Sequence, residues 1–191
     1  YFLPRSVGHV QDNKQDQSFW AKVRESDALV HVSRNFLGPG HTEITPESDL
    51  NTMNQELILT DLVVTENRIE RLAHDNQRGK KYNPEEFHLL QKILETLENE
   101  TPLREVPELA LAPVLRGYAF LSAKPILVLF NNEDDDDQMP ATLSAETAGE
   151  HMVIRGKLEQ ELAQMTNEEA AEFLAEFNIT TSAMDRVLRR S

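Results

Sequence analysis

Two polar residues, Asn131 and Asp134, follow directly on the apolar run 125–130 and form an N-x-x-D pattern. A carboxylate at such a place offers two acceptor oxygens, and guanine presents two matching donors, its ring N–H and its exocyclic amine. Adenine has an acceptor at the same ring position, so the carboxylate discriminates against it. The asparagine of such a pattern contacts the base and steadies neighbouring loops. N-x-x-D also occurs often by chance, and a polar turn after a strand is the alternative interpretation.

A second segment strengthens the first interpretation. The apolar run 151–154 is followed by Arg155, Gly156 and Lys157. A guanine site needs a small residue at this turn, so that backbone N–H groups reach the purine oxygen, and a long side chain that covers the ring. Gly156 and Lys157 meet this requirement, whereas Arg155 does not, because Ser or Cys is common at that place. The two segments together predict a base site formed by four residues: Asn131, Asp134, Gly156 and Lys157.

Neither a phosphate-binding nor a metal-binding pattern accompanies these segments. The sequence G-x-x-x-x-G-K-[ST] is absent, and Gly38 and Gly40 lack the Lys-Ser/Thr pair and the following helix. The six histidines are scattered without metal-ligand spacing, and the absence of cysteine excludes disulfides, thiol catalysis and thiolate metal sites. We therefore predict no catalytic residue and no metal ligand in the 191 residues.

The charge of the chain narrows its range of partners. Lys and Arg number 19 and Asp and Glu 33, which gives a formal net charge of −14. Such a chain repels phosphodiester backbones, so direct DNA binding is not expected. Since no run approaches the roughly 20 apolar residues of a membrane helix, and no signal-peptide pattern is present, we expect a cytoplasmic protein without membrane contact. The chain does not begin with Met, and we expect residues upstream of Tyr1.

The elements that must position the four site residues follow an α/β order. Three apolar runs without polar alternation predict strands covered on both faces of a parallel sheet: 28–32, 125–130 and 151–154. Helical spacing predicts a helix that contains residues 19–23, another over 108–123, and a third that opens at Asn167, its expected cap.

The middle third predicts an antiparallel helical hairpin. Apolar residues recur at steps of three, four and seven among charged neighbours over 49–78, and the pattern returns over 84–100. Turn residues separate the two stretches, and Pro84 stands at the expected first helical position. A basic cluster near this turn serves either solubility or contact with a partner: Arg78, Lys80 and Lys81.

Several strings in this order resemble the YchF/Obg-like ATPase family of P-loop GTPases. Residues 19–36 are similar to that family's helix after switch II and the next strand, strings within 49–72 to its inserted coiled-coil arm, and 118–125 to the stretch before its base-recognition loop. The resemblance implies an α/β, P-loop-NTPase-like parallel-sheet core over 1–48 and 101–180. It further implies an inserted helical hairpin over 49–100 and a C-terminal extension over 181–191.

The resemblance implies a GTP-binding protein in which this chain supplies the purine-recognition residues and the arm. The family's P-loop would lie upstream of Tyr1, and no D-x-x-G element for Mg²⁺ is present near the start. Hydrolysis of GTP or ATP, and Mg²⁺ binding, would therefore require an upstream segment. Many members carry Glu where this chain has Asp134, so GTP or GDP is the expected ligand and ATP the second candidate. The alternative is a non-hydrolysing relative whose hairpin docks on the ribosome or another protein.

Overall fold

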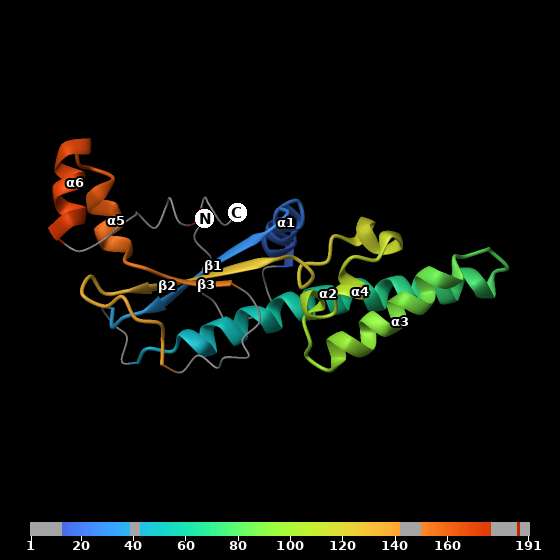
Figure 1. Cartoon of the computed structure of the whole chain (residues 1–191). Coiled ribbons are helices and arrows are strands. Elements are labelled where there is room, and N and C mark those ends of the chain that lie inside the picture. Colours follow the sequence, from blue (N-terminus) through green and yellow to red (C-terminus); the bar gives the residue numbers. More distant parts are fainter. Residues whose placement is uncertain (1–12, 39–42, 142–149, 177–186, 188–191) are drawn as a thin grey trace. The chain divides into compact units, whose positions relative to one another are not determined.

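The computed structural model describes residues 13–38, 43–141, 150–176 and 187, and Figure 1 shows their helices and strands. The chain divides into two compact units. The helical unit takes its described residues from Tyr1–Leu29 and Asn54–Pro125, and the sheet unit takes them from Val30–Met53 and Ile126–Ser191.

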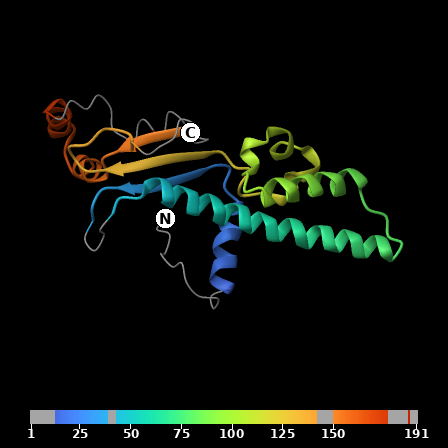
Figure 2. The ribbon, with the colours of Figure 1, turned by 90° about the horizontal axis from the view of Figure 1, so that it is seen from below.

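The sheet unit contains a three-stranded sheet with the order β1-β2-β3. Its strands are β1 (Leu29–Asn35), β2 (Ile126–Asn132) and β3 (Glu150–Ile154). Strands β2 and β3 are parallel, with a register that runs from Leu127 opposite Glu150 to Asn131 opposite Ile154. The three arrows point the same way in Figure 2. The predicted α/β class with a parallel sheet is confirmed, and all three strands lie where the apolar runs placed them.

Strand β1 departs from the expectation that both faces are covered. Val30 and Val32 are 57% and 56% exposed, whereas Ser33 is buried. Successive side chains of a strand point to opposite faces, so the two valines share one face. The described residues cover the opposite face of β1 more fully, and an apolar run alone does not report that difference.

Two short helices follow β3 in the sheet unit: α5 (Gly156–Leu162) and α6 (Asn167–Glu176). The expected cap of α6, Asn167, is its first helical residue, and Thr166 caps the helix instead. The backbone N–H of Glu169 donates to Thr166 Oγ1 at 3.4 Å, and the backbone N–H of Thr166 donates to Glu169 Oε2 at 2.9 Å. This reciprocal pair is a capping box, whose T-x-x-E spacing is present in the sequence.

The predicted antiparallel hairpin is present as α2 (Pro46–Gln77) and α3 (Pro84–Glu98), preceded by α1 (Asn13–Arg24). Figure 1 shows α3 running back beside α2 in the helical unit. Asn83 caps α3 by accepting a hydrogen bond from the backbone N–H of Glu85 at 3.0 Å. Proline at the first helical position loses no hydrogen bond, because that N–H has no partner within the helix.

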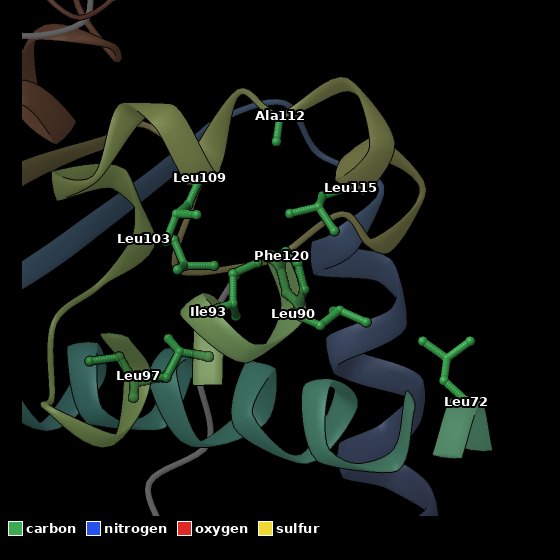
Figure 3. Packing of buried hydrophobic residues seen from close by; sticks show 10 residues of the cluster. Leu72, Leu90, Ile93, Leu97, Leu103, Leu109, Ala112, Leu115 and Phe120 are labelled. Carbon is green, nitrogen blue, oxygen red and sulfur yellow. The ribbon is translucent and has the colours of Figure 1, made fainter. Parts of the chain in front are cut away.

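The prediction of a helix over 108–123 is wrong. The structure has two short turns in this range, α4 (Pro107–Ala110) and η2 (Pro113–Tyr118), and a third, η1 (Leu103–Glu105), just before it. Prolines open two of these turns and cannot donate to a preceding carbonyl, and Ala119 adopts a left-handed conformation with φ 48°. Leu109, Leu115 and Phe120 are nevertheless buried with apolar residues of the hairpin, whereas Leu111 is exposed. Figure 3 shows this cluster, in which the labelled residues are Leu72, Leu90, Ile93, Leu97, Leu103, Leu109, Ala112, Leu115 and Phe120.

A buried carboxylate joins three segments of the helical unit. Asp61 of α2 is fully buried, and its oxygens accept hydrogen bonds from the backbone N–H groups of Leu121 and Ser122 at 3.0 and 2.7 Å. Arg24 of α1 lies 3.1 Å from the same carboxylate. Burial raises the pKa of Asp61, while these hydrogen bonds and the Arg24 charge act to lower it. The helical periodicity of α2 gave no sign of this role.

Candidate functional site

The carboxyl ends of β2 and β3 lie side by side, because Asn131 is opposite Ile154 in the parallel register. The side-chain oxygen of Asn131 accepts a hydrogen bond from the backbone N–H of Gly156 at 2.8 Å. The two turns that sequence reasoning paired across 25 residues are thus joined directly. Ligands of open α/β sheets bind at this edge, outside the carboxyl ends of the strands.

The Asp134 carboxylate lies at the same edge. Its Oδ2 is 2.7 Å from Lys157 Nζ, and its main-chain carbonyl accepts a hydrogen bond from Arg155 Nη1 at 3.4 Å. The Lys157 side chain is 70% exposed and that of Asp134 28% exposed, so the ion pair is open to solvent. The hydrogen bond and the negative charge of Asp134 raise the pKa of Lys157. All four predicted residues therefore meet at one place; their contact with a base stays a prediction.

Gly156 makes a close contact that the sequence did not predict. A Cβ at this residue would lie 2.8 Å from Asn131 Oδ1 and 3.2 Å from its Nδ2. The glycine thus permits the close approach of the Asn131 side chain. We expected its N–H to reach a purine oxygen, but in the structure this N–H donates to Asn131.

Arg155 was the residue that did not fit the predicted pattern, and the structure gives it a contact. Its guanidinium reaches from the start of α5 to the main chain of Asp134. Together with Lys157, it brings two positive charges toward the acidic run Glu133–Asp137. The loop after β2 is therefore held to the turn after β3 through both the main chain and the side chain of one residue, Asp134.

Two further asparagines at this edge were missed. Asn35, the last residue of β1, donates from Nδ2 to Asn132 Oδ1 at 2.9 Å. Asn132, the last residue of β2, donates from Nδ2 to the carbonyl of Gln138 at 2.7 Å. A signal was present in the sequence for Asn132, which together with Asn131 comes directly after the apolar run 125–130, whereas Asn35 follows the run 28–32 only after Ser33 and Arg34.

This edge offers carboxylate and amide oxygens, an exposed cation in Lys157, a partly buried cation in Arg155 and a tight glycine turn. Within the described ranges, no three His, Asp or Glu side chains come together in a way that could hold a metal ion. The described helices include none with the length and apolar character needed to cross a bilayer.

The chain is similar to curated proteins described as "Ribosome-binding ATPase YchF". It is 32% identical to the Bacillus subtilis protein, with 91% of this chain and 51% of that protein covered. It is 35% identical to the Haemophilus ducreyi protein, with 90% and 50% covered. The chain therefore spans about half the length of the curated relatives it matches. No family model matches the chain.

The fold is also that of a solved structure, the Schizosaccharomyces pombe YchF GTPase. The TM-score is 0.76 at 23% sequence identity, and the match covers 98% of this chain and 54% of that protein. This likeness shows the fold, including the α/β core typical of P-loop NTPases.

Proposed function

Because the chain belongs to the YchF/Obg-like family, we propose that it is part of a nucleotide-binding protein and supplies the purine-recognition half of the site. The base-binding residues of the proposal are Asn131, Asp134, Gly156 and Lys157. The observation that carries it is the juxtaposition of the Asn131–Asp134 turn and the Gly156–Lys157 turn, which are hydrogen-bonded at one sheet edge.

Each residue has a distinct role in this proposal. Asp134 accepts hydrogen bonds from the ring N–H and the exocyclic amine of guanine. One of its oxygens pairs with Lys157, and an ion pair this exposed contributes little free energy, so a base can displace it. The aliphatic stem of Lys157 then covers the face of the ring. Asn131 holds the two turns together through Gly156.

The relatives are described by different activities, ATPase and GTPase, so base preference has to be measured. We propose GTP and GDP as the favoured ligands and ATP as the second candidate, because Asp134 provides acceptors where adenine also presents one. Titration of GDP and ADP against the intact protein tests this.

Asp134→Ala should lower the ratio of guanine to adenine affinity about tenfold or more, since two hydrogen bonds to a charged acceptor are lost. Asp137→Ala, an exposed aspartate of the same loop, is the matched control and should leave the ratio unchanged. An equal loss of affinity for both nucleotides in Asp134→Ala would contradict the assigned role. Failure of the unaltered protein to bind any of GDP, GTP and ATP would contradict the nucleotide-binding proposal, and only the docking function described below would stand.

Hydrolysis belongs to the proposal only for a protein that also has a phosphate loop. Phosphoryl transfer requires a phosphate cradle, a metal anchor and an oriented water, and none of these patterns occurs in the present sequence. GTPase or ATPase activity and Mg²⁺ binding are therefore proposed to depend on a segment upstream of Tyr1. The proposed organisation remains a nucleotide-binding core over 1–48 and 101–180, a hairpin over 49–100 and an extension over 181–191.

A second proposed function is docking on the ribosome, in the cytoplasm, through the helical hairpin. The curated relatives are described as ribosome-binding. In this chain, Arg78 and Lys81 are exposed at the turn between α2 and α3, and Lys80 there pairs with Asp75 at 2.9 Å. Cations on an otherwise acidic chain suit contact with RNA phosphates.

A further inference from the structure

Asn132 is a buried polar residue whose two side-chain ends are both used. It is the last residue of β2 and is only 4% exposed. A buried carboxamide is stable only when its donor and its acceptor both find partners. The Asn132 amide nitrogen donates to the Gln138 carbonyl at 2.7 Å, since a carbonyl can only accept. The Asn132 amide oxygen therefore faces Asn35, whose Nδ2 donates to it at 2.9 Å. The orientation of this amide is therefore determined by its surroundings.

The loop that Asn132 closes carries strong internal repulsion. Residues 133–137 are five consecutive carboxylates, Glu133 followed by four Asp. Two hydrogen bonds from backbone N–H groups fold the loop: Asp136 N–H donates to the Glu133 carbonyl at 3.2 Å, and Gln138 N–H donates to the Asp136 side chain at Oδ1, at 2.9 Å. Like charges this close favour an open loop. The bond from Asn132 to Gln138 opposes this by tying the last residue of the loop to the end of the strand.

The two neighbouring asparagines bind different segments: Asn131 binds the turn after β3, and Asn132 binds the end of the loop 133–138. Successive side chains of a strand point to opposite faces. Asn131 accordingly reaches Gly156, and Asn132 reaches Gln138 and Asn35. Asp134 lies between these two attachments. Its own ion pair with Lys157 is exposed and therefore weak, so the buried amide is the stronger constraint on the loop.

We propose that Asn132, anchored by Asn35, is a positioning residue that closes loop 133–138 and thereby sets the base preference of the site. It determines where the Asp134 carboxylate stands relative to Gly156, without itself contacting the base. The effect on base preference rests on the proposed purine site, whereas the closure of the loop by Asn132 does not depend on it.

The first measurement is hydrogen exchange in the intact protein without nucleotide. Asn132→Ala should speed exchange of the loop amides of Asp136 and Gln138 about tenfold, as expected for one lost hydrogen bond. High salt should reduce this gain, because it screens the carboxylate repulsion. Met139→Ala, an exposed residue next to the loop, is the control and should change nothing. Unaltered exchange of the loop in Asn132→Ala would overturn the inference.

The second measurement is the ratio of GDP to ADP affinity in the same variants. Asn132→Ala should lower this ratio about tenfold, whereas a merely structural loss would weaken both nucleotides equally. Asn35→Ala keeps the hydrogen bond from Asn132 to Gln138. It should therefore speed loop exchange and lower the ratio of GDP to ADP affinity, each by less than Asn132→Ala does. If Asn132→Ala does not fold, the Asn35→Ala variant tests the inference in its place. Faster exchange with an unchanged ratio would overturn the role in specificity. Binding of neither nucleotide by the unaltered protein would instead overturn the proposed function, with loop closure still judged by exchange.

Discussion

The pair formed by Asn131 and Gly156 shows how the site depends on a single missing side chain. The Asn131 amide fills the space where a Cβ of residue 156 would stand. Its oxygen accepts the Gly156 N–H at 2.8 Å, which brings the turn after β3 against the end of β2. The absence of a side chain at Gly156 thus allows the Asn131 side chain to contact the Gly156 backbone. This contact aligns the two proposed base-binding turns.

Gly156→Ala should destabilise the sheet unit by about 1 to 3 kcal/mol, because the new methyl group forces the Asn131 side chain aside. Base affinity should fall as well, since Asn131 no longer joins the turns. The matched control is Gly117→Ala, where a Cβ would meet nothing within 4 Å. Urea unfolding and nucleotide titration of both variants check this; equal stability of the two variants would show that Asn131 relaxes without cost.

At the level of elements, the two hairpin helices end in the same way with different residues. In α2 the Gly79 N–H donates to the Asn76 carbonyl and the Lys80 N–H to that of Asp75. In α3 the corresponding bonds run from Glu100 to Leu97 and from Thr101 to Thr96. Both are Schellman ends, which place one residue in the left-handed region. That residue is Gly79 in α2, with φ 77°, and Glu100 in α3, with φ 56°.

These two ends predict substitutions of opposite sign. Gly79→Ala should lower the free energy of unfolding by about 1 kcal/mol, since Ala resists positive φ. Glu100→Gly should raise it by up to about 1 kcal/mol, because it removes the same conformational cost and an unfavourable negative charge at a helix C-terminus. Glu100→Gln retains the backbone cost and isolates the effect of charge. Chemical denaturation measures all three; a destabilised Glu100→Gly variant would contradict the argument.

The hairpin is also joined to η2 by a charged cluster whose effect depends on pH. Glu86 of α3 lies 2.7 Å from Arg68 Nη2, and Tyr118 donates its hydroxyl hydrogen to the same carboxylate oxygen. Partial burial acts to raise the pKa of Glu86, but the hydrogen bonds from Tyr118 and Arg68 and the Arg68 charge bring it below its ordinary value of 4.5. Burial first, and then the hydrogen bond to Glu86, raises the pKa of Tyr118 to about 12.

Stability of the helical unit should therefore fall at both extremes of pH. A lowered carboxyl pKa means that the unfolded chain binds more protons, so this stabilisation is present above pH 4.5 and is lost as the pH falls through the lower folded pKa. A raised phenol pKa gives stabilisation that is present below pH 10.0 and lost as the pH rises to about 12. Denaturation across pH should show a smaller acid loss in Glu86→Gln and a smaller alkaline loss in Tyr118→Phe. Acid and alkaline losses that persist unchanged would assign them to other groups.

For the whole molecule, the uneven placement of charge is the main feature. The net charge is −14, yet the turn between α2 and α3 carries Arg78, Lys80 and Lys81. Salt largely screens the repulsion between phosphate groups and acidic side chains that lie more than about 10 Å apart, whereas a cation in direct contact with a phosphate is screened much less. An acidic chain can therefore approach RNA through a basic tip.

Lys81→Glu should weaken association with ribosomes several-fold and reduce its salt dependence, because one phosphate contact is lost. Lys92→Glu makes the same charge change at an exposed position in α3 and serves as the matched control. Co-sedimentation with ribosomes at two salt concentrations measures the difference. Equal losses of ribosome binding in the two variants would mean that net charge causes the loss, and would contradict a docking role for the turn between α2 and α3.

The sequence by itself predicted the order of the strands and the hairpin, and which two turns meet at one edge of the sheet. Apolar runs predicted β1, β2 and β3, and helical spacing with Pro84 predicted the hairpin, because these signals depend on residues a few positions apart. The same local signal failed over 108–123. There, prolines and the left-handed Ala119 break the helix, while Leu109, Leu115 and Phe120 still pack in one core with the hairpin.

Tertiary structure alone decided which polar groups meet. Asn131 finds Gly156 across 25 residues, Asn35 finds Asn132 across 97, and Asp61 binds backbone groups about 60 residues away. A side chain's local sequence gives its residue type and face, but its partner depends on strand register and on how the core packs. Buried amides and carboxylates then accept whichever donors that packing brings within reach, because leaving them without partners is costly.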